Sequence, residues 1–168
     1  MKPTLNLNGP ILGTKVLCNN DVIAEDVSIS LPNGALQTVE FKALGTLNVP
    51  IPMTDNLEAT VNSVGLDKGL FKLLGPESRQ YEFRMAQTVV SRDGVQKTIG
   101  IKAFITGSSS AILGGDSEVG STIDGSIPIT ATRYRLVIDG EEVMLIDKLN
   151  GILKFNGKDY AEDVYSLL

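Results

Sequence analysis

The chain has 168 residues and a mass of 18.0 kDa, with 15 Lys and Arg against 20 Asp and Glu. This length fits one domain over residues 1–168. The net charge of −5 and the pI of about 4.7 argue against a dedicated nucleic-acid binder, which needs a basic face. The chain has no His, which excludes Ser-His-Asp catalysis, Cys-His catalysis and His-ligated metal sites. It has a single Cys, which excludes an intrachain disulfide.

No targeting segment is expected. The stretch Met1–Pro10 has no apolar run long enough for a signal-peptide core. The longest aliphatic run, Val143–Ile146, is far short of the roughly 20 residues that span a bilayer. We therefore expect a soluble protein with no membrane anchor, made in a cytoplasm, that leaves the cell by lysis or through a dedicated machine if it leaves at all.

The first third of the chain predicts strands. Cys18 falls near the end of a first strand, where we expect a small buried hydrophobe and not a reactive thiol. Alternating apolar and polar residues, with a period of two, then predict one strand over residues 23–31 and another over 38–43.

Residues 45–56 break this pattern. Pro50 and Pro52 remove backbone donors, so the segment is expected to be neither a central strand nor a helix. Several of its side chains are nevertheless apolar, and an exposed apolar segment must cover either its own core or a neighbour. The sequence alone leaves both options open.

Alternation returns over residues 57–62 and is followed by a predicted helix at about 66–75. Leu66, Leu70, Leu73 and Leu74 recur at helical spacing, and Gly75-Pro76 ends the helix. Gly69 lies inside it and weakens the helix. The role expected for this helix is core packing.

The second half predicts hairpins. Strands near residues 81–85 and 95–105 flank Arg92-Asp93-Gly94, and a strand from 127 precedes Asp139-Gly140; both are tight-turn sequences. Asn156-Gly157 is a third such dipeptide. The apolar phase of the strand from 127 shifts by one position before Tyr134, which predicts a β-bulge. Residues 107–125, rich in Gly and Ser, predict a loop that is mobile or ordered only by a partner.

Catalytic patterns are missing. Ser108 and its neighbours lack the second Gly of a nucleophile elbow, Lys97-Thr98 lacks a phosphate-binding loop, and Gly114–Glu118 lacks calcium-loop spacing. Adjacent acids such as Glu141-Glu142 point to opposite faces of a strand. The sequence therefore predicts no catalytic, cofactor or metal site.

The C-terminal third carries the most specific pattern. Tyr134–Asn150, with its Asp-Gly hairpin and its strand ending in Ile146-Asp147, followed by Phe155-Asn156-Gly157, resembles the major tail tube protein family of contractile-tailed phages. Val16–Asn20 and Val27–Pro32 are similar to that family's opening hairpin, and the order of helix, strands and Gly-rich loop also matches over nearly the whole chain. The Gly/Ser-rich character of 107–125 and the short N-terminus depart from the family pattern.

The resemblance implies a mainly β fold, a β-barrel or sandwich with one short flanking α-helix, and a structural protein with no enzymatic activity. It implies hexameric rings that stack into a hollow tube. The implied partners are a sheath protein outside, a tape-measure protein inside during assembly, and a baseplate and a tail terminator at the ends. DNA would pass without specific binding, which suits an acidic protein because like charges repel phosphates. The expected location is the virion tail or a phage-tail-like particle.

The resemblance also implies an axial, ring-stacking loop at about residues 33–56. Its expected apolar contacts with the next ring are the six residues Leu47, Val49, Pro50, Ile51, Pro52 and Met53. The loop at 107–125 is either a second axial contact or a solvent-exposed segment. Residues 134–168 form the expected C-terminal hairpin and tail.

Three alternatives stay open. The tube of a phage-tail-like bacteriocin or of a type VI-like secretion system would have the same protomer, and neighbouring genes would distinguish them. A monomeric β-sandwich binding module is the remoter alternative; such modules usually expose aromatic residues, whereas this chain has no Trp and 4 Tyr.

Overall fold

The structure is a computed structural model that describes residues 6–168. The start of the Met1–Pro10 stretch therefore lies outside the described residues. Strands dominate the described chain, as the alternation predicts. In order they are β1 (Leu7–Cys18), β2 (Asp21–Glu25), β3 (Ser28–Ser30), β4 (Leu36–Ala43), β5 (Gly45–Thr54), β6 (Leu57–Ser63), β7 (Gly75–Val90), β8 (Gln96–Ser109), β9 (Gly125–Ile138), β10 (Glu141–Asp147), β11 (Ile152–Phe155) and β12 (Lys158–Asp159).

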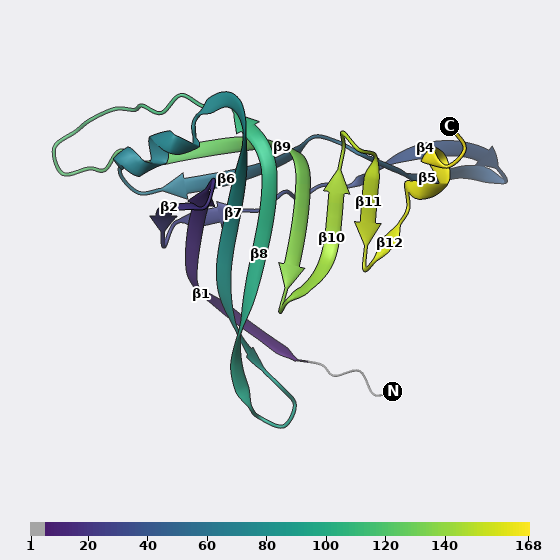
Figure 1. The fold of residues 1–168 in the computed structure, drawn as a ribbon, viewed down its shortest axis with the longest axis horizontal. Helices are drawn as coiled ribbons and strands as arrows, with labels where there is room; N and C mark the ends of the chain where they lie inside the picture. The colour runs from purple at the N-terminus through teal and green to yellow at the C-terminus, as the bar shows by residue number, and fades with distance from the viewer. Residues whose placement is uncertain (1–5) are drawn as a thin grey trace.

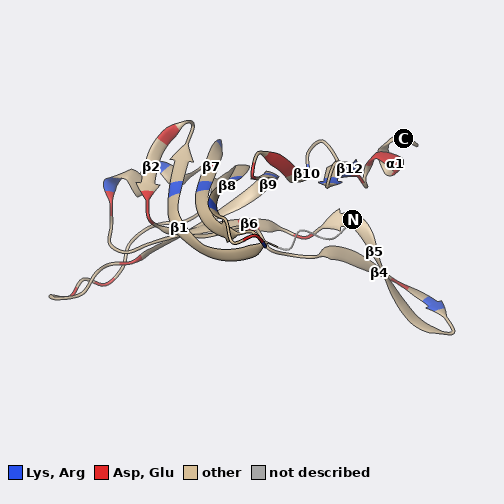
Figure 2. Ribbon diagram, turned by 90° about the horizontal axis from the view of Figure 1, so that it is seen from below, with Lys and Arg blue, Asp and Glu red and all other residues tan. Residues whose placement is uncertain are grey.

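Two layers of strands enclose the core (Figures 1 and 2). One layer is a large antiparallel sheet in the order β12-β11-β10-β9-β8-β7-β1-β2, and the other contains β6, which pairs with β3 and with the first half of β9. The mainly β fold expected from the sequence is confirmed.

Strand β9 belongs to both layers because a bulge reorients it. Residues Gly125–Ala131 pair with β6, whereas residues 133–138 pair with β10. Against β8 the register jumps, because Thr106 faces Arg133 but Gly107 faces Ala131, so Thr132 is the extra residue. The bulge keeps both Ile129 and Tyr134 facing the core, and it confirms the predicted change of phase.

The core is aliphatic with three buried aromatic rings, Tyr81, Phe83 and Tyr134. Tyr81 donates a hydrogen bond of 3.0 Å to the Leu73 carbonyl, and burial raises the pKa of its phenol. Burial raises the pKa of Tyr134 to about 12. Both phenols therefore stay neutral at physiological pH. The other buried apolar residues of the contiguous core cluster are Val16, Cys18, Ile23, Leu57, Ala59, Val61, Leu70, Leu73, Ala103, Ile105, Ile127, Ile129, Ala131, Ile146, Leu153 and Ala161.

The helix expected at 66–75 is present but is shorter and tighter. A 3₁₀-helix, η1, spans Lys68–Leu73, and Leu70 and Leu73 are its buried residues, so its core-packing role is confirmed. Asp67 is its N-cap and accepts from the Gly69 amide at 3.0 Å. A side chain at Gly69 would place its Cβ 2.8 Å from the Ile23 carbonyl oxygen. The close approach of β2 therefore explains why this position is a glycine, whereas the sequence pattern indicated only that Gly69 weakens the helix.

The single strand expected over 23–31 is wrong, because the chain turns between β2 and β3. Asp26 has a positive φ of 53°, and its amide donates to the Thr14 carbonyl at 2.9 Å. This turn sends β2 along β1 and β3 along β6, in the other layer. Apolar alternation continues through a change of layer, so the pattern alone does not reveal it.

Three hairpin turns lie where the turn sequences predict them. Arg92-Asp93-Gly94 joins β7 to β8, Asp139-Gly140 joins β9 to β10, and Asn156-Gly157 joins β11 to β12. Both residues of each of the latter two dipeptides have positive φ, as a type I′ turn requires.

The loop expected over 107–125 is shorter at both ends, since β8 continues to Ser109 and β9 begins at Gly125. Gly107 is a strand residue beside the bulge, where a Cβ would lie 2.1 Å from the Thr130 carbonyl oxygen. Its glycine therefore serves close strand packing. A short helix, α1 (Glu162–Tyr165), which the sequence did not suggest, lies near the C-terminus. Across the described residues, the helices are too short to cross a membrane.

Candidate assembly interface

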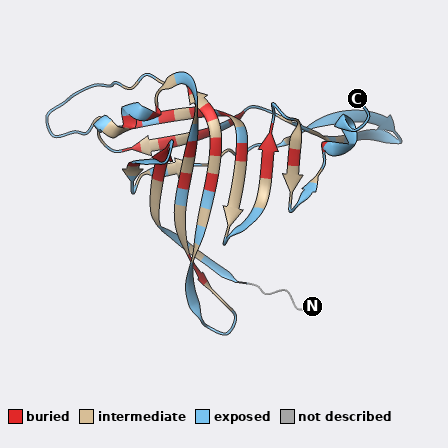
Figure 3. Ribbon diagram, in the orientation of Figure 1, coloured by how far each residue is buried: buried red, intermediate tan, exposed pale blue. Residues whose placement is uncertain are grey.

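A two-stranded arm projects from one end of the molecule (Figure 1). It consists of β4 and β5, which form a sheet of their own, separate from the large one. Most of the arm is exposed to solvent (Figure 3). An isolated two-stranded ribbon is at best marginally stable in water. Contact with another molecule would therefore stabilise the arm.

The arm has one apolar face. Val39 lies opposite Val49 and Phe41 lies opposite Leu47, so these four side chains share one side of the ribbon. Val39, Phe41 and Leu47 are 39%, 53% and 55% exposed. The other side carries polar residues, including the Glu40–Asn48 pair. An exposed apolar face rimmed by polar residues is typical of a protein–protein contact.

Hydrogen bonds hold the root of the arm to the body. Gln37, in β4, donates to a carboxylate oxygen of Asp55 at 3.0 Å, and the Lys148 ammonium donates to the Asp55 carbonyl oxygen. Lys148 belongs to the turn between β10 and β11. The direction of the arm is therefore coupled to the C-terminal hairpins.

Asp147 orders that turn. It is 7% exposed and accepts hydrogen bonds from the Leu149 amide at 3.1 Å and from the Asn150 amide and side chain at 3.1 and 2.8 Å. Burial alone would raise the pKa of Asp147, but these hydrogen bonds and the nearby Arg133 lower it overall. The carboxylate therefore stays ionised and fixes the residues that precede β11.

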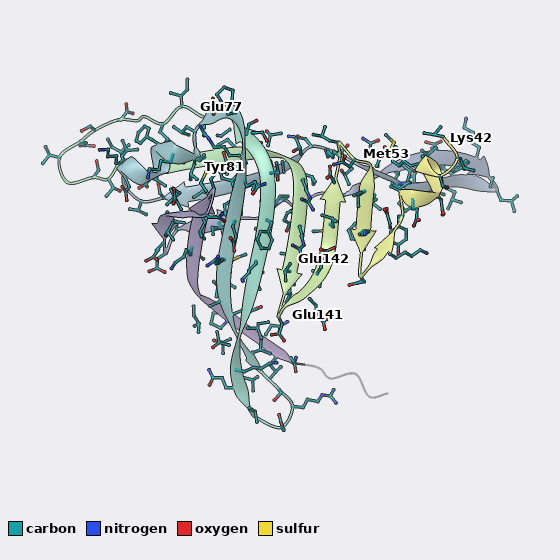
Figure 4. All side chains as sticks on the ribbon, in the orientation of Figure 1. Lys42, Met53, Glu77, Tyr81, Glu141 and Glu142 are labelled. Carbon is teal, nitrogen blue, oxygen red and sulfur yellow. The ribbon has the colours of Figure 1, made fainter. Side chains whose placement is uncertain are left out.

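The structure divides the six predicted contact residues into two groups. Leu47 and Val49 lie on the apolar face of the arm, and Pro50 lies opposite Thr38 on the polar face. Beyond Pro50 the pairing shifts, and Ile51 is half-buried. Pro52 and Met53 are at the root, where they line a cavity of about 220 Å³ with Leu153 and Tyr165. Figure 4 labels Met53 near the base of the arm.

The expectation that residues 45–56 are neither strand nor helix is wrong for most of the segment, because Gly45–Thr54 is β5. Proline is excluded only where its amide must donate, and a two-stranded ribbon leaves the outer edge of each strand free. Sequence reasoning did not single out Val39 and Phe41, which share the apolar face of the arm with Leu47 and Val49. Their alternation was visible, but the absence of a covering layer was not.

The outward face of the large sheet carries both basic and acidic residues (Figure 2). Arg135 contacts Glu142 at 2.6 Å, and its guanidinium lies 5.4 Å from the centre of the Phe104 ring. Arg84 contacts Glu82 at 2.6 Å on the same face. Lys15, Arg84 and Lys102 lie side by side on this face, in register across β1, β7 and β8. Lys15 forms an ion pair with Glu25 at 2.8 Å, so acidic neighbours offset part of this basic row.

The Gly/Ser-rich loop projects from the end of the molecule opposite the arm (Figure 1). Ile112 and Val119 are 95% and 104% exposed, whereas Ala111 and Leu113 pack against the core. The root of the loop is thus anchored and its outer part is free of the protomer's own core.

The residues singled out for chemistry have structural roles. Cys18 is buried at the end of β1, and burial raises the pKa of its thiol. Ser109 is 2% exposed and donates to the Pro128 carbonyl at 2.7 Å, which ties β8 to β9. Glu142 is the partner of Arg135. Within residues 6–168, no group of His, Cys, Asp or Glu side chains is placed to hold a metal ion.

Comparison with known proteins assigns the fold to a family. The family model described as phage tail tube protein FII matches residues 11–168. The tail tube protein of Escherichia phage P2 is 26% identical over 145 residues, which cover 80% of this chain and 81% of the P2 protein. The resemblance seen in the sequence is thereby confirmed, and with it a structural role in the tail tube of a phage virion. The chain belongs to the phage tail tube protein family.

Proposed function

We propose that this protein is the protomer of the inner tube of a contractile tail, in which hexameric rings stack into a hollow conduit for genome delivery. The observation that carries the proposal is the arm: its apolar face stays about half exposed in the described protomer, and the chain belongs to the phage tail tube protein family. A tube covers that face because every arm meets another copy of the chain.

Assembly physics supports rings. Identical subunits that join through two different surfaces form a heterologous contact, which closes into a ring or continues as a filament. A tube of stacked rings needs both kinds of contact: a closed ring of contacts around the axis and a continuing series of contacts along it. We assign the axial contact to the arm, with Leu47 and Val49 among its central residues and Val39 and Phe41 beside them.

The remaining partners follow from the same proposal. A sheath protein surrounds the tube, a tape-measure protein occupies it during assembly, and a baseplate and a tail terminator bind its ends. DNA passes without specific binding, which the net charge of −5 supports because like charges repel phosphates. Synthesis takes place in the host cytoplasm before the tail is assembled.

The test is negative-stain microscopy of the purified protein across a range of concentrations, with light-scattering mass measured on the same samples. The proposal predicts six-fold rings or hollow tubes that appear above a threshold concentration. Addition of purified baseplate serves as a nucleus for samples that stay monomeric. A protein that remains monomeric at every concentration, with and without that nucleus, contradicts the proposal and favours a monomeric binding module.

A further inference from the structure

We infer that the tip of the arm inserts into a groove at the opposite end of a neighbouring protomer in the adjacent ring. The inference rests on the proposed function, and it goes further by naming the surface that receives the arm. Two features of the protomer carry it: an exposed tip with one positive charge, and an acidic groove with an apolar floor.

The tip presents an apolar knob beside a single charge. Leu44 forms the turn between β4 and β5, and its side chain is fully exposed, at 110% of the reference area. Lys42, two residues earlier, is the charged side chain nearest the tip (Figure 4). Leu44 contributes nothing to the core of its own protomer, so a partner is needed to bury it.

The groove lies between β2, β3, the end of β6, the start of η1 and the start of β9, and has a volume of about 650 Å³. Pockets of this size hold a drug-sized ligand, which is ample for a leucine and a lysine side chain. Its apolar lining residues are Ala24, Val27, Val64 and Leu70. Val64 is 82% exposed at the rim, so apolar surface is available to Leu44.

The charge of the groove is complementary to the tip. Its charged lining residues are Glu25, Asp26, Asp67 and Asp124, and its lining, drawn from the described residues, contains no Lys or Arg. Glu25 pairs with Lys15 at 2.8 Å. The other three acids form no ion pair within residues 6–168, which leaves negative charge for Lys42. Complementary charge fixes orientation and accelerates association.

The positions of the tip and the groove allow the contact to repeat from one copy of the chain to the next. The arm and the groove lie at opposite ends of the long axis of the molecule (Figures 1 and 2). A protomer therefore cannot insert its own tip into its own groove. A contact between opposite ends of identical molecules is heterologous, and it leaves a free tip and a free groove for the next copy.

The experiment is disulfide cross-linking in assembled tubes. A double variant, Leu44→Cys with Val64→Cys, places one thiol on the tip and one at the groove rim, while native Cys18 is buried. Oxidation is expected to produce a ladder of covalent species beyond the dimer, because each protomer carries both halves of the contact. The matched control pairs Leu44→Cys with Val95→Cys, at another exposed apolar position, and should give no ladder.

A charge exchange provides the second measurement. Lys42→Glu is expected to raise the concentration needed for tube formation about five-fold, and adding Asp124→Lys is expected to restore it. Arg92→Glu makes the same charge change at the β7–β8 turn and should have little effect.

Two outcomes distinguish a wrong groove assignment from a wrong proposed function. Wild-type tubes, with no ladder from the Leu44–Val64 variant and no rescue by the charge exchange, overturn the groove assignment but leave the tube function standing. A wild-type protein that forms neither rings nor tubes contradicts the proposed function itself.

Discussion

Truncation of the apolar pair Phe41 and Leu47 is the change that bears most directly on the role of the arm. These residues lie opposite each other on one face of the ribbon and belong to no part of the buried core. The double variant Phe41→Ala with Leu47→Ala should therefore fold normally and assemble poorly.

The expected loss of assembly free energy follows from the exposed fractions of the two side chains. Complete burial of a Leu or Phe side chain contributes about 1.5–3 kcal/mol. Phe41 and Leu47 are already about half covered in the protomer, at 53% and 55% exposed. Each therefore adds about 1 kcal/mol when a partner covers the rest. A combined loss of about 2 kcal/mol per contact raises the assembly concentration roughly 30-fold.

Sedimentation across a concentration series measures the assembly threshold, and urea denaturation measures the free energy of unfolding of the protomer. The matched control is Thr38→Ala with Asn48→Ala, which removes polar side chains from the opposite face of the same ribbon. The reasoning fails if the apolar double variant assembles at the wild-type concentration, or if both double variants weaken assembly equally.

Three further predictions concern the scaffold and the loop. Gly107→Ala should lower the free energy of unfolding by about 3 kcal/mol, because its Cβ would lie 2.1 Å from the Thr130 oxygen, whereas Gly114→Ala, with open space around it, should be nearly neutral in the same denaturation experiment. Asp147→Asn should cost about 2 kcal/mol of unfolding free energy at neutral pH, because a carboxylate that accepts three hydrogen bonds is lost. Since the pKa of Asp147 is lowered in the folded protein, the advantage of the wild type over that variant should be constant above the ordinary carboxyl pKa and should shrink as pH falls through the lowered value; an unchanged difference under acid would contradict this account. Limited proteolysis should cut the exposed loop near Val119 in the protomer and spare it in the tube if the loop is an axial contact, whereas equal cleavage in both would identify a loop that stays in solvent.

The sequence predicted those features that depend on local chemistry. The turns at Asp139-Gly140 and Asn156-Gly157 require positive φ, and the bulge before Tyr134 leaves a change of phase in the apolar pattern. Such signals lie within a few residues of one another, so no knowledge of the rest of the fold is needed to find them.

The features that it missed depend on distant partners. Gly69 and Gly107 are glycines because the backbones of β2 and β9 approach them, and nothing near them in the sequence shows this. The strand expected over 23–31 breaks at Asp26 because its two halves join different layers. Val39 and Phe41 alternate like any strand with one buried face, and only the structure shows that this face is partly exposed in the protomer.

The most direct test of the central claim is a cryo-electron-microscopy reconstruction of tubes assembled from the purified wild-type chain. The account predicts hexameric rings in which residues 36–54 of each protomer cross the ring boundary, with Val39, Phe41, Leu47 and Val49 buried against the next ring. A reconstruction in which the arm stays within its own ring, or in which its apolar face remains open to solvent, would contradict it.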